Sequence, residues 1–149
     1  DSVTQMKVAL LISMLFVSCH AGIFDFLKVN AHVTVRGKLI CSKPFNYRLT
    51  LVEEDLVFDE MIEEQGALSS PPGTVNYEVK GELDDPRPES TVEPVVTVEH
   101  SCGKVNGCVC LELMHVSGDV VFDADVNLEK THHKRCKMCD IVQKKRGPA

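Results

Sequence analysis

Cysteine and histidine are the side chains through which this sequence could carry out chemistry. The 149 residues contain seven cysteines and six histidines. Several lie close together, in the segments 100–102, 108–110 and 132–139. Thiolates and imidazoles bind zinc, a thiol beside an imidazole can act as an activated nucleophile, and cysteines in an oxidising compartment form disulfides. The elements that carry these residues decide between the three uses.

The segments 100–102 and 108–110 are expected on two strands joined by a turn. Side chains two residues apart on a strand share a face, so His100 accompanies Cys102, and Cys108 accompanies Cys110. Across the turn, Cys102 is expected within reach of one member of the second pair. The other member, or Cys102 itself, would be available to Cys41. We therefore expect disulfides here instead of a catalytic or metal-binding pair, with His100 as a packing or hydrogen-bonding residue.

The C-terminal segment offers a second group of possible ligands. His132, His133, Cys136 and Cys139 form an H-x-x-C-x-x-C pattern that could bind a metal ion. Adjacent histidines rarely both reach one tetrahedral ion, and a redox-active C-x-x-C would need a thioredoxin-like context, which the sequence lacks. A disulfide within this segment, or between it and the rest of the chain, is the expectation. We expect no resident cofactor.

The N-terminal residues predict export. Lys7 precedes an apolar run from 8 to 17 and a small-residue stretch, which is the pattern of a signal peptide cleaved after Ala21. The run is too short to span a bilayer as a helix, which needs about 20 residues. A lipidated Cys19 is disfavoured because Phe16 stands where a lipoprotein signal usually has leucine. Cleavage removes one cysteine and leaves six disulfide candidates, Cys41, Cys102, Cys108, Cys110, Cys136 and Cys139.

The net charge of -6 divides unevenly along the chain. Residues 22–129 carry 20 acidic and 8 basic side chains, whereas the tail, residues 130–149, carries 7 basic and 1 acidic. The acidic body argues against nucleic-acid binding. The tail forms a basic arm that either binds an anionic membrane surface or glycan, or folds back on the acidic body. The arm consists of Lys134, Arg135, Lys137, Lys144, Lys145 and Arg146.

Alternation of apolar and polar residues predicts a series of strands. The clearest is 74–83, with Val75, Tyr77 and Val79 on the inward face. The segment 56–68 fits either a short helix or an irregular strand. The other strands are expected at 32–41 with a bulge at Gly37, 47–52, 95–102, 108–114 as the hairpin partner of 95–102, and 120–128 with Phe122, Ala124, Val126 and Leu128 on one face.

Turn signals separate these strands. Ser69 to Gly73 is expected to be a loop, and the proline-containing segment 84–88 is expected to lack regular structure. About seven strands without helix-length segments between them predict an all-β fold, a β-sandwich. The absence of Trp disfavours an antibody-type domain. The expected organisation is 1–21 as upstream residues and signal peptide, 22–30 as a lead, 31–129 as the sandwich domain and 130–149 as the tail.

The order of these segments resembles the nematode transthyretin-like family. The resemblance rests on V-R-G-K-L-I-C at 35–41, L-T-L-V-E-E-D at 49–55, P-V-V-T-V-E-H-S-C at 94–102, F-D at 122–123 and N-L-E at 127–129. It covers about 31–129 and implies a secreted, prealbumin-type sandwich of seven to eight strands. Residues 69–75 depart from the turn usual in that family, and the tail beyond Lys130 is an addition.

The resemblance implies a secreted, non-catalytic protein that binds a small apolar ligand, a lipid or a cell-surface receptor. Two alternatives are weighed against it. A fold-related hydroxyisourate hydrolase would need a C-terminal Tyr-Arg-Gly-Ser, and this chain ends Arg-Gly-Pro-Ala. A disulfide-stapled protease inhibitor could present the loop from Asp84 to Pro88, with Arg87 between two prolines, as bait, although nothing in the sequence selects a protease.

Overall fold

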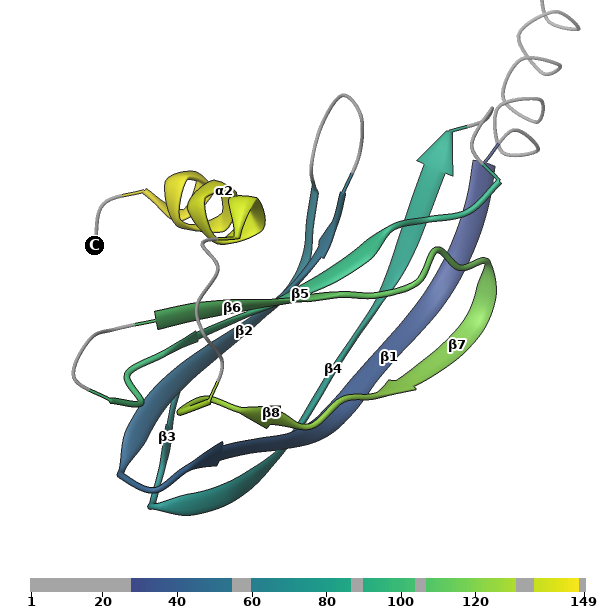
Figure 1. The fold of residues 1–149 in the computed structure, drawn as a ribbon. Helices are drawn as coiled ribbons and strands as arrows, with labels where there is room; N and C mark the ends of the chain where they lie inside the picture. Colours follow the sequence, from purple (N-terminus) through teal and green to yellow (C-terminus); the bar gives the residue numbers. More distant parts are fainter. Residues whose placement is uncertain (1–27, 55–59, 87–89, 104–106, 131–135, 148–149) are drawn as a thin grey trace, which may run out of the picture.

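The computed structural model describes residues 28–54, 60–86, 90–103, 107–130 and 136–147. Within these ranges the chain is an all-β sandwich of two sheets with one short helix (Figure 1). None of the described helices is long and apolar enough to cross a membrane. The elements are β1 (Lys28–Cys41), β2 (Phe45–Glu53), β3 (Glu60–Ser70), β4 (Gly73–Pro86), β5 (Pro94–His100), β6 (Gly107–Glu112), β7 (Gly118–Asp123), β8 (Val126–Asn127) and α2 (Lys137–Arg146).

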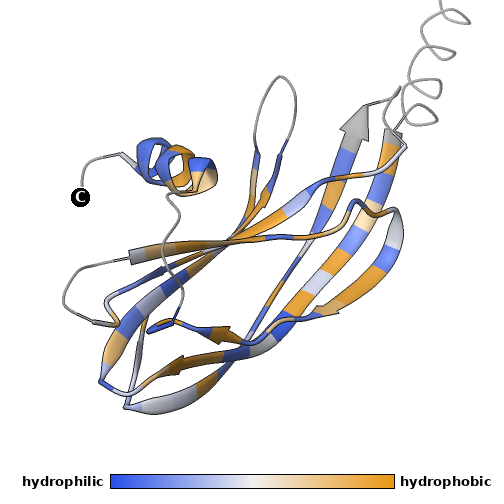
Figure 2. Cartoon of the chain, viewed as in Figure 1, coloured by the Kyte–Doolittle hydropathy of each residue, from blue (hydrophilic) through white to orange (hydrophobic). Residues whose placement is uncertain are grey.

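The first sheet, sheet A, is built around β1. β1 pairs with β4 antiparallel along its whole length, and with β7 and then β8 in parallel on its other edge. Its odd-numbered residues, such as Val33, Val35 and Leu39, are buried, whereas Arg36 and Lys38 are exposed. Figure 2 shows this alternation of apolar and polar residues along β1. One face of sheet A therefore packs inward and the other faces outward.

The second sheet, sheet B, is antiparallel, with the order β3-β2-β5-β6. Its inward face carries Leu49 and Leu51 of β2 and Val96 and Val98 of β5, all fully buried. These side chains meet the inward face of sheet A in one continuous apolar core. Tyr47 lies on the same face, as the alternation over 47–52 predicts, and it is 7% exposed.

Several predicted boundaries are corrected by the pairing. The described part of the ambiguous segment 56–68 is a strand, because β3 pairs with β2 from Glu60 to Ser70. The predicted loop at 69–73 is shorter, because Ser69 and Ser70 still pair with β2. The proline-containing segment was expected to be irregular, yet β4 extends to Pro86, opposite Lys28. A proline is tolerated there because β4 is an edge strand of sheet A.

Gly37 is not at a bulge. β1 and β4 remain in register through Gly37, which lies opposite Tyr77. On the other edge, β1 changes partner here from β7 to β8, and the predicted strand 120–128 is interrupted between Asp123 and Val126. At this junction the backbone of Ala124 passes so close to Gly37 that a Cβ atom would lie 2.5 Å from the Ala124 carbonyl carbon. The glycine is required by a close approach of two backbones.

The predicted tail contains the helix α2, which the alternation of apolar and polar residues does not predict. Met138 and Val142 of α2 are buried against Val52 and Val95 on the outward face of sheet B. Thr50 lies on the same face of β2 and is fully buried. The helix thus covers the outward face of sheet B, as the position of α2 beside β5 and β6 in Figure 1 illustrates.

Candidate functional site

All six cysteines of the described residues form disulfides, which confirms this part of the sequence prediction. Cys41 at the end of β1 pairs with Cys102 just beyond β5. Cys108 pairs with Cys139, and Cys110 with Cys136. The Cα–Cα distances are 6.0 to 6.2 Å, in the range typical of disulfides. Three disulfides indicate an oxidising environment.

The expected bridge between Cys102 and Cys108 or Cys110 is wrong, and the alternative pairing of Cys102 with Cys41 is right. Cys102 is 5% exposed and belongs to the core between the sheets. Val109 of β6 also points into this core, so its neighbours Cys108 and Cys110 point to the outward face of sheet B. A disulfide across the hairpin would have to pass through the sheet.

His100 has the packing and hydrogen-bonding role expected of it. It is 4% exposed, and its Nδ1 atom accepts a hydrogen bond from the backbone N–H of Cys102 at 3.2 Å. The sulfur of Cys102 is bonded to Cys41 and is not a free thiol. The pair His100 and Cys102 therefore does not form an activated nucleophile in this state.

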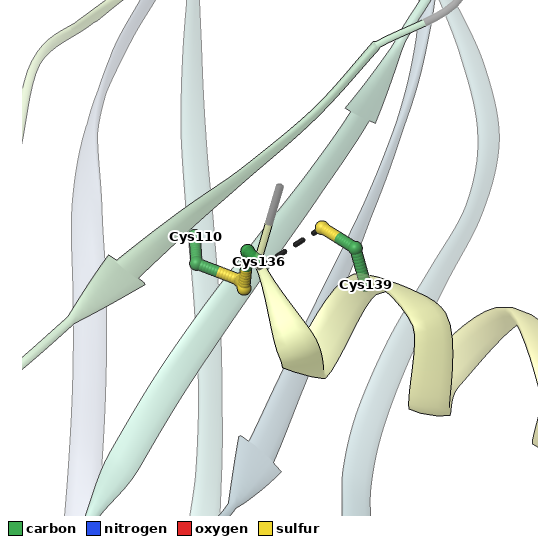
Figure 3. Close-up of side chains that lie close together, drawn as sticks. All are labelled: Cys110, Cys136 and Cys139. Atoms are coloured by element: carbon green, nitrogen blue, oxygen red, sulfur yellow. Dashed lines mark hydrogen bonds between the residues drawn. A yellow bond between two sulfur atoms is a disulfide. The ribbon is translucent and has the colours of Figure 1, made fainter. Parts of the chain in front are cut away.

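The remaining four cysteines gather at one point, which we call the four-cysteine centre (Cys108, Cys110, Cys136 and Cys139). Figure 3 shows Cys110 on β6 facing Cys136 and Cys139 at the first turn of α2. The Sγ atoms of Cys110 and Cys139, which belong to different disulfides, are 3.8 Å apart. The Sγ atoms of Cys110, Cys136 and Cys139 all lie within 4.8 Å of one another. The two disulfides therefore form one cluster of sulfur atoms.

The far end of α2 is held by charged side chains. Arg146 donates to Glu64 of β3 at 2.8 Å and to Glu99 of β5 at 2.8 Å, and Gln143 donates to Glu99 at 2.9 Å. Arg48 donates to the second oxygen of Glu64 at 2.7 Å. Burial opposes ionisation of Glu64, but Arg146 and Arg48 outweigh it, so the pKa of Glu64 is lowered. The same contacts raise the pKa of Arg146 against the effect of its own burial.

The structure places part of the predicted basic arm against the acidic body. Arg146 makes the contacts described above, and Lys137 lies 3.6 Å from Glu54. Lys144 and Lys145 are exposed on α2. The remaining candidates of the arm, Lys134 and Arg135, and the candidate ligands His132 and His133 lie outside the described residues.

The outward face of sheet A, which we call the open face, differs from that of sheet B. It is formed by alternate residues of three paired strands, with exposed side chains of both charges and one exposed apolar residue, Val121 at 58%. Among the described residues, no helix or strand covers it. Its members include His32, Thr34, Arg36 and Lys38 of β1, Glu78, Lys80 and Glu82 of β4, and Asp119, Val121 and Asp123 of β7.

The open face is hollowed beside Gly37. The hollow has a volume of about 500 Å³ and is bordered mainly by polar and charged side chains of β1, β4 and the β7–β8 junction. Arg36 donates to Asp123 at 2.8 Å, and the backbone N–H of Lys38 donates to Asp125 at 2.9 Å. Beneath it, Tyr77 donates its hydroxyl to the carbonyl oxygen of Ala124 at 2.6 Å, and burial raises the pKa of Tyr77 to about 12.

Sequence reasoning missed this hollow. Arg36 and Asp123 are 87 residues apart, and only the parallel pairing of β1 with β7 brings them together. The one local signal is Gly37, whose position in phase with the buried residues of β1 marks a close backbone approach. Sequence reasoning also did not predict that Cys108 and Cys110 are the residues that pair with the tail cysteines.

No family model, no curated protein and no solved structure matches the chain. The structure therefore supports a description at the level of architecture. Over the ranges that the structure describes, the chain is an all-β sandwich with three disulfides, and the helix α2 lies on one of the two sheets.

Proposed function

We propose that this chain is a secreted, non-catalytic binding protein of transthyretin-like type, and that it binds a cell-surface protein through the open face. The observation that carries the proposal is the difference between the two outward faces. The helix α2 covers the outward face of sheet B, whereas no described residue covers that of sheet A. The eight strands in two layers and three disulfides of the described residues support the expected prealbumin-type, extracellular domain.

The charges of the open face favour a protein partner. Lys80 lies beside Thr34, which in turn neighbours Val121, and the next pairs along the strands join Glu78, Arg36 and Asp123. Positive and negative side chains are interspersed around one exposed apolar residue. A protein surface can match such a mixed pattern, whereas an anionic bilayer presents one sign of charge and would be repelled by the carboxylates.

The other partners named by the sequence fit this face less well. A small apolar ligand needs a cavity that encloses most of its surface, whereas the hollow beside Gly37 is open to one side and bordered by Arg36, Asp123 and other charged residues. For a hydrolase, the candidate pair that the sequence suggested is His100 and Cys102, and the sulfur of Cys102 is bonded to Cys41. The inhibitor alternative depends on Arg87, which lies outside the described residues.

Binding to intact cells tests the proposal. The fluorescently labelled full chain, with its signal peptide removed, is expected to bind saturably, to be displaced by unlabelled chain and to lose binding when the cells are first treated with trypsin. Two matched variants locate the surface. Val121→Glu changes the exposed valine of β7 on the open face, and Met114→Glu changes a methionine that is 75% exposed in the segment between β6 and β7, outside the strands of sheet A.

We expect Val121→Glu to weaken binding at least about tenfold, as for a residue within an interface, and Met114→Glu to change it less than about twofold. Absence of saturable binding, or equal loss in both variants, would contradict the proposal. Binding that survives trypsin but is reproduced by vesicles of equal parts phosphatidylserine and phosphatidylcholine would indicate a lipid partner instead.

The contribution of the basic arm to cell binding is tested by substitutions and not by truncation of the tail. Removal of the tail after Glu129 would leave Cys108 and Cys110 without their disulfide partners. The double variant Lys144→Gln and Lys145→Gln leaves the disulfides and the Arg146 contacts in place. Unchanged cell binding by this variant would assign binding to the sandwich, as proposed, whereas its loss would assign it to the arm.

A further inference from the structure

We propose that the four-cysteine centre, once its two disulfides are reduced, binds one Zn²⁺ as a tetrahedral tetrathiolate. The proposal concerns the outward face of sheet B and does not depend on binding by the open face. Two sulfur donors come from a strand, in the C-x-C spacing of Cys108 and Cys110. The other two come from a helix start, in the C-x-x-C spacing of Cys136 and Cys139, which is common in structural zinc sites.

The distances between sulfur atoms fit a zinc ion. With zinc–sulfur bonds of about 2.3 Å, the sulfur atoms of a regular tetrahedron lie about 3.8 Å apart. The Sγ atoms of Cys110 and Cys139 already have this separation, 3.8 Å, although they belong to different disulfides and no covalent bond joins them; the dashed line in Figure 3 marks this contact. The Sγ atom of Cys136 lies within 4.8 Å of both. The Sγ atom of Cys108 is bonded to that of Cys139 and lies outside this group of three, so after reduction its side chain has to rotate towards the other sulfurs to complete the site.

Contacts other than the disulfides hold the two elements in place. Val142 of α2 is fully buried and Met138 is 3% exposed, and both pack on the outward face of sheet B. At the other end of the helix, Arg146 contacts Glu64 and Glu99 at 2.8 Å each. Because these contacts do not depend on the cysteine sulfurs, we expect reduction to leave α2 beside β6. The donor set therefore stays assembled, which lowers the entropy cost of metal binding.

The environment suits thiolate ligands. The two tail cysteines lie at the start of α2, where Cys136 is the N-cap residue. The positive end of the helix dipole stabilises negative charge there and favours the thiolate over the thiol. Cys108 and Cys110 are partly buried and belong to a paired strand. A structural zinc site with four cysteines is closed, so it would hold the helix on the sheet as the disulfides do.

Reduction of the disulfides and binding of zinc are two separate steps. A dithiol reductant supplies two electrons and two protons to each disulfide and is itself oxidised to a disulfide, so two dithiols convert the centre to four thiols. One Zn²⁺ then displaces four protons, which pass to solvent, and four zinc–sulfur bonds form. The metal neither gains nor loses electrons. The reduced chain thus gains a second way of holding α2.

A second group of possible ligands is weaker and serves as the comparison. Cys41, Cys102 and Glu129 also lie within 4.8 Å of one another, as Cys110, Cys136 and Cys139 do, but Glu129 is exposed, and no second disulfide brings a fourth sulfur as Cys108 is brought by Cys139. Four thiolates satisfy the preference of zinc for tetrahedral sulfur coordination without a further ligand. The double variant Cys41→Ser and Cys102→Ser removes the weaker group and leaves the four-cysteine centre intact.

Cobalt and zinc binding to the full chain, with its signal peptide removed, test the proposal. The chain is reduced with a water-soluble phosphine, which is then removed under nitrogen, and Co²⁺ is titrated in. We expect one Co²⁺ per chain, the d–d and charge-transfer bands of a tetrahedral cobalt thiolate, and displacement of these bands by Zn²⁺. The oxidised chain should show none of them. Native mass spectrometry should give one zinc per reduced chain.

The variants distinguish this site from adventitious thiol binding. Cys110→Ser together with Cys136→Ser should weaken Co²⁺ binding at least about tenfold, the lower range seen even for loss of an outer-shell partner. The double variant of Cys41 and Cys102 should bind like the parent chain. Absence of the bands in the reduced parent, or equal binding by the Cys110 and Cys136 variant, would overturn the proposal.

A separate measurement tests whether the reduced chain stays folded around the metal. Hydrogen exchange of the α2 amides should be slow in the oxidised chain, faster after reduction, and slow again when Zn²⁺ is added. Metal binding of the same affinity in concentrated guanidinium chloride, without renewed protection of α2, would show chelation by an unfolded chain. That result would also refute the site.

Discussion

Replacement of Gly37 by alanine should destabilise the sandwich more than the same replacement at Gly66 or Gly81. A Cβ atom at position 37 would overlap the carbonyl oxygen of Ala124 and lie 2.5 Å from its carbonyl carbon. Carbon atoms in ordinary contact lie about 3.5–4.0 Å apart, so the β7–β8 junction would have to move by about 1 Å. The obstacle is backbone, which cannot rotate away as a side chain can.

The magnitude follows from what the displacement breaks. The N–H of Ala124 donates to the carbonyl oxygen of Arg36 at 2.8 Å, and Tyr77 donates to the carbonyl oxygen of Ala124 at 2.6 Å. A shift of this size takes both beyond hydrogen-bonding distance, at about 1 kcal/mol each, and overpacking adds about 1–3 kcal/mol. Alanine restricts the backbone of the unfolded chain more than glycine does, which offsets about 0.4–1 kcal/mol of this loss of stability. The free energy of unfolding should therefore fall by about 2–4.5 kcal/mol.

Equilibrium unfolding in urea, with the disulfides intact, measures this change as a lower midpoint at an unchanged slope. Two other glycines serve as controls. At Gly66 a Cβ atom would meet nothing within 4 Å, so Gly66→Ala should change stability by less than about 0.5 kcal/mol. At Gly81 it would lie 2.5 Å from a side-chain methyl of Ile62, which can move, so Gly81→Ala should fall between the two.

The order of the three variants in loss of stability tests whether the close approach of Ala124 constrains position 37. If Gly37→Ala unfolds at the same urea concentration as the parent chain, or later, the close approach of Ala124 to β1 is not what constrains this position. Equal losses at Gly37 and Gly66 would likewise show that the cost comes from the loss of a glycine as such, and not from the crossing of β1 by the β7–β8 junction.

Three further outcomes are expected. Replacing Cys41 and Cys102 by serine opens a loop of 61 residues and should lower the free energy of unfolding in urea by about 4 kcal/mol; a negligible loss would contradict the loop-entropy argument. Because burial raises the pKa of Tyr77 to about 12, an absorbance titration of the folded chain should show this tyrosine ionising well above pH 10. The stability that its burial contributes is complete below about pH 10 and is lost as the pH rises towards 12. Ionisation of Tyr77 near pH 10 in the folded chain would contradict the raised pKa. Arg146→Gln should lower the free energy of unfolding by about 1 kcal/mol at neutral pH. Because the pKa of Glu64 is lowered, the difference in melting temperature between variant and parent should shrink as the pH falls below about 4.5. A difference that does not depend on pH would mean that Glu64 is not the group involved.

The strands could be predicted because their signal is local. Alternation with a period of two residues places Val75, Tyr77 and Val79 on one face whatever their neighbours are, and the structure buries Tyr77 and Val79. The same reasoning identified the hairpin of β5 and β6. It erred at strand ends, as at Pro86, because a strand continues for as long as a neighbouring strand offers hydrogen-bond partners.

The candidate sites could be predicted only in part. The sequence identified the six cysteines and their expected oxidation, because count and spacing are properties of the chain itself. It could not choose among the pairings, because that choice depends on which side of sheet B each sulfur faces. Burial of Val109 sends Cys108 and Cys110 outward to the tail and leaves Cys102 for Cys41.

The sequence alone thus determined an acidic, disulfide-containing all-β domain with a basic tail, since composition and alternation are read one segment at a time. Only the tertiary structure decided that α2 covers the outward face of sheet B, that four sulfurs meet where it begins, and that the outward face of sheet A is open among the described residues. These features join segments that are 26 to 87 residues apart. Such contacts form because burying apolar surface on both sheets fixes how the strands stack, which no local pattern encodes.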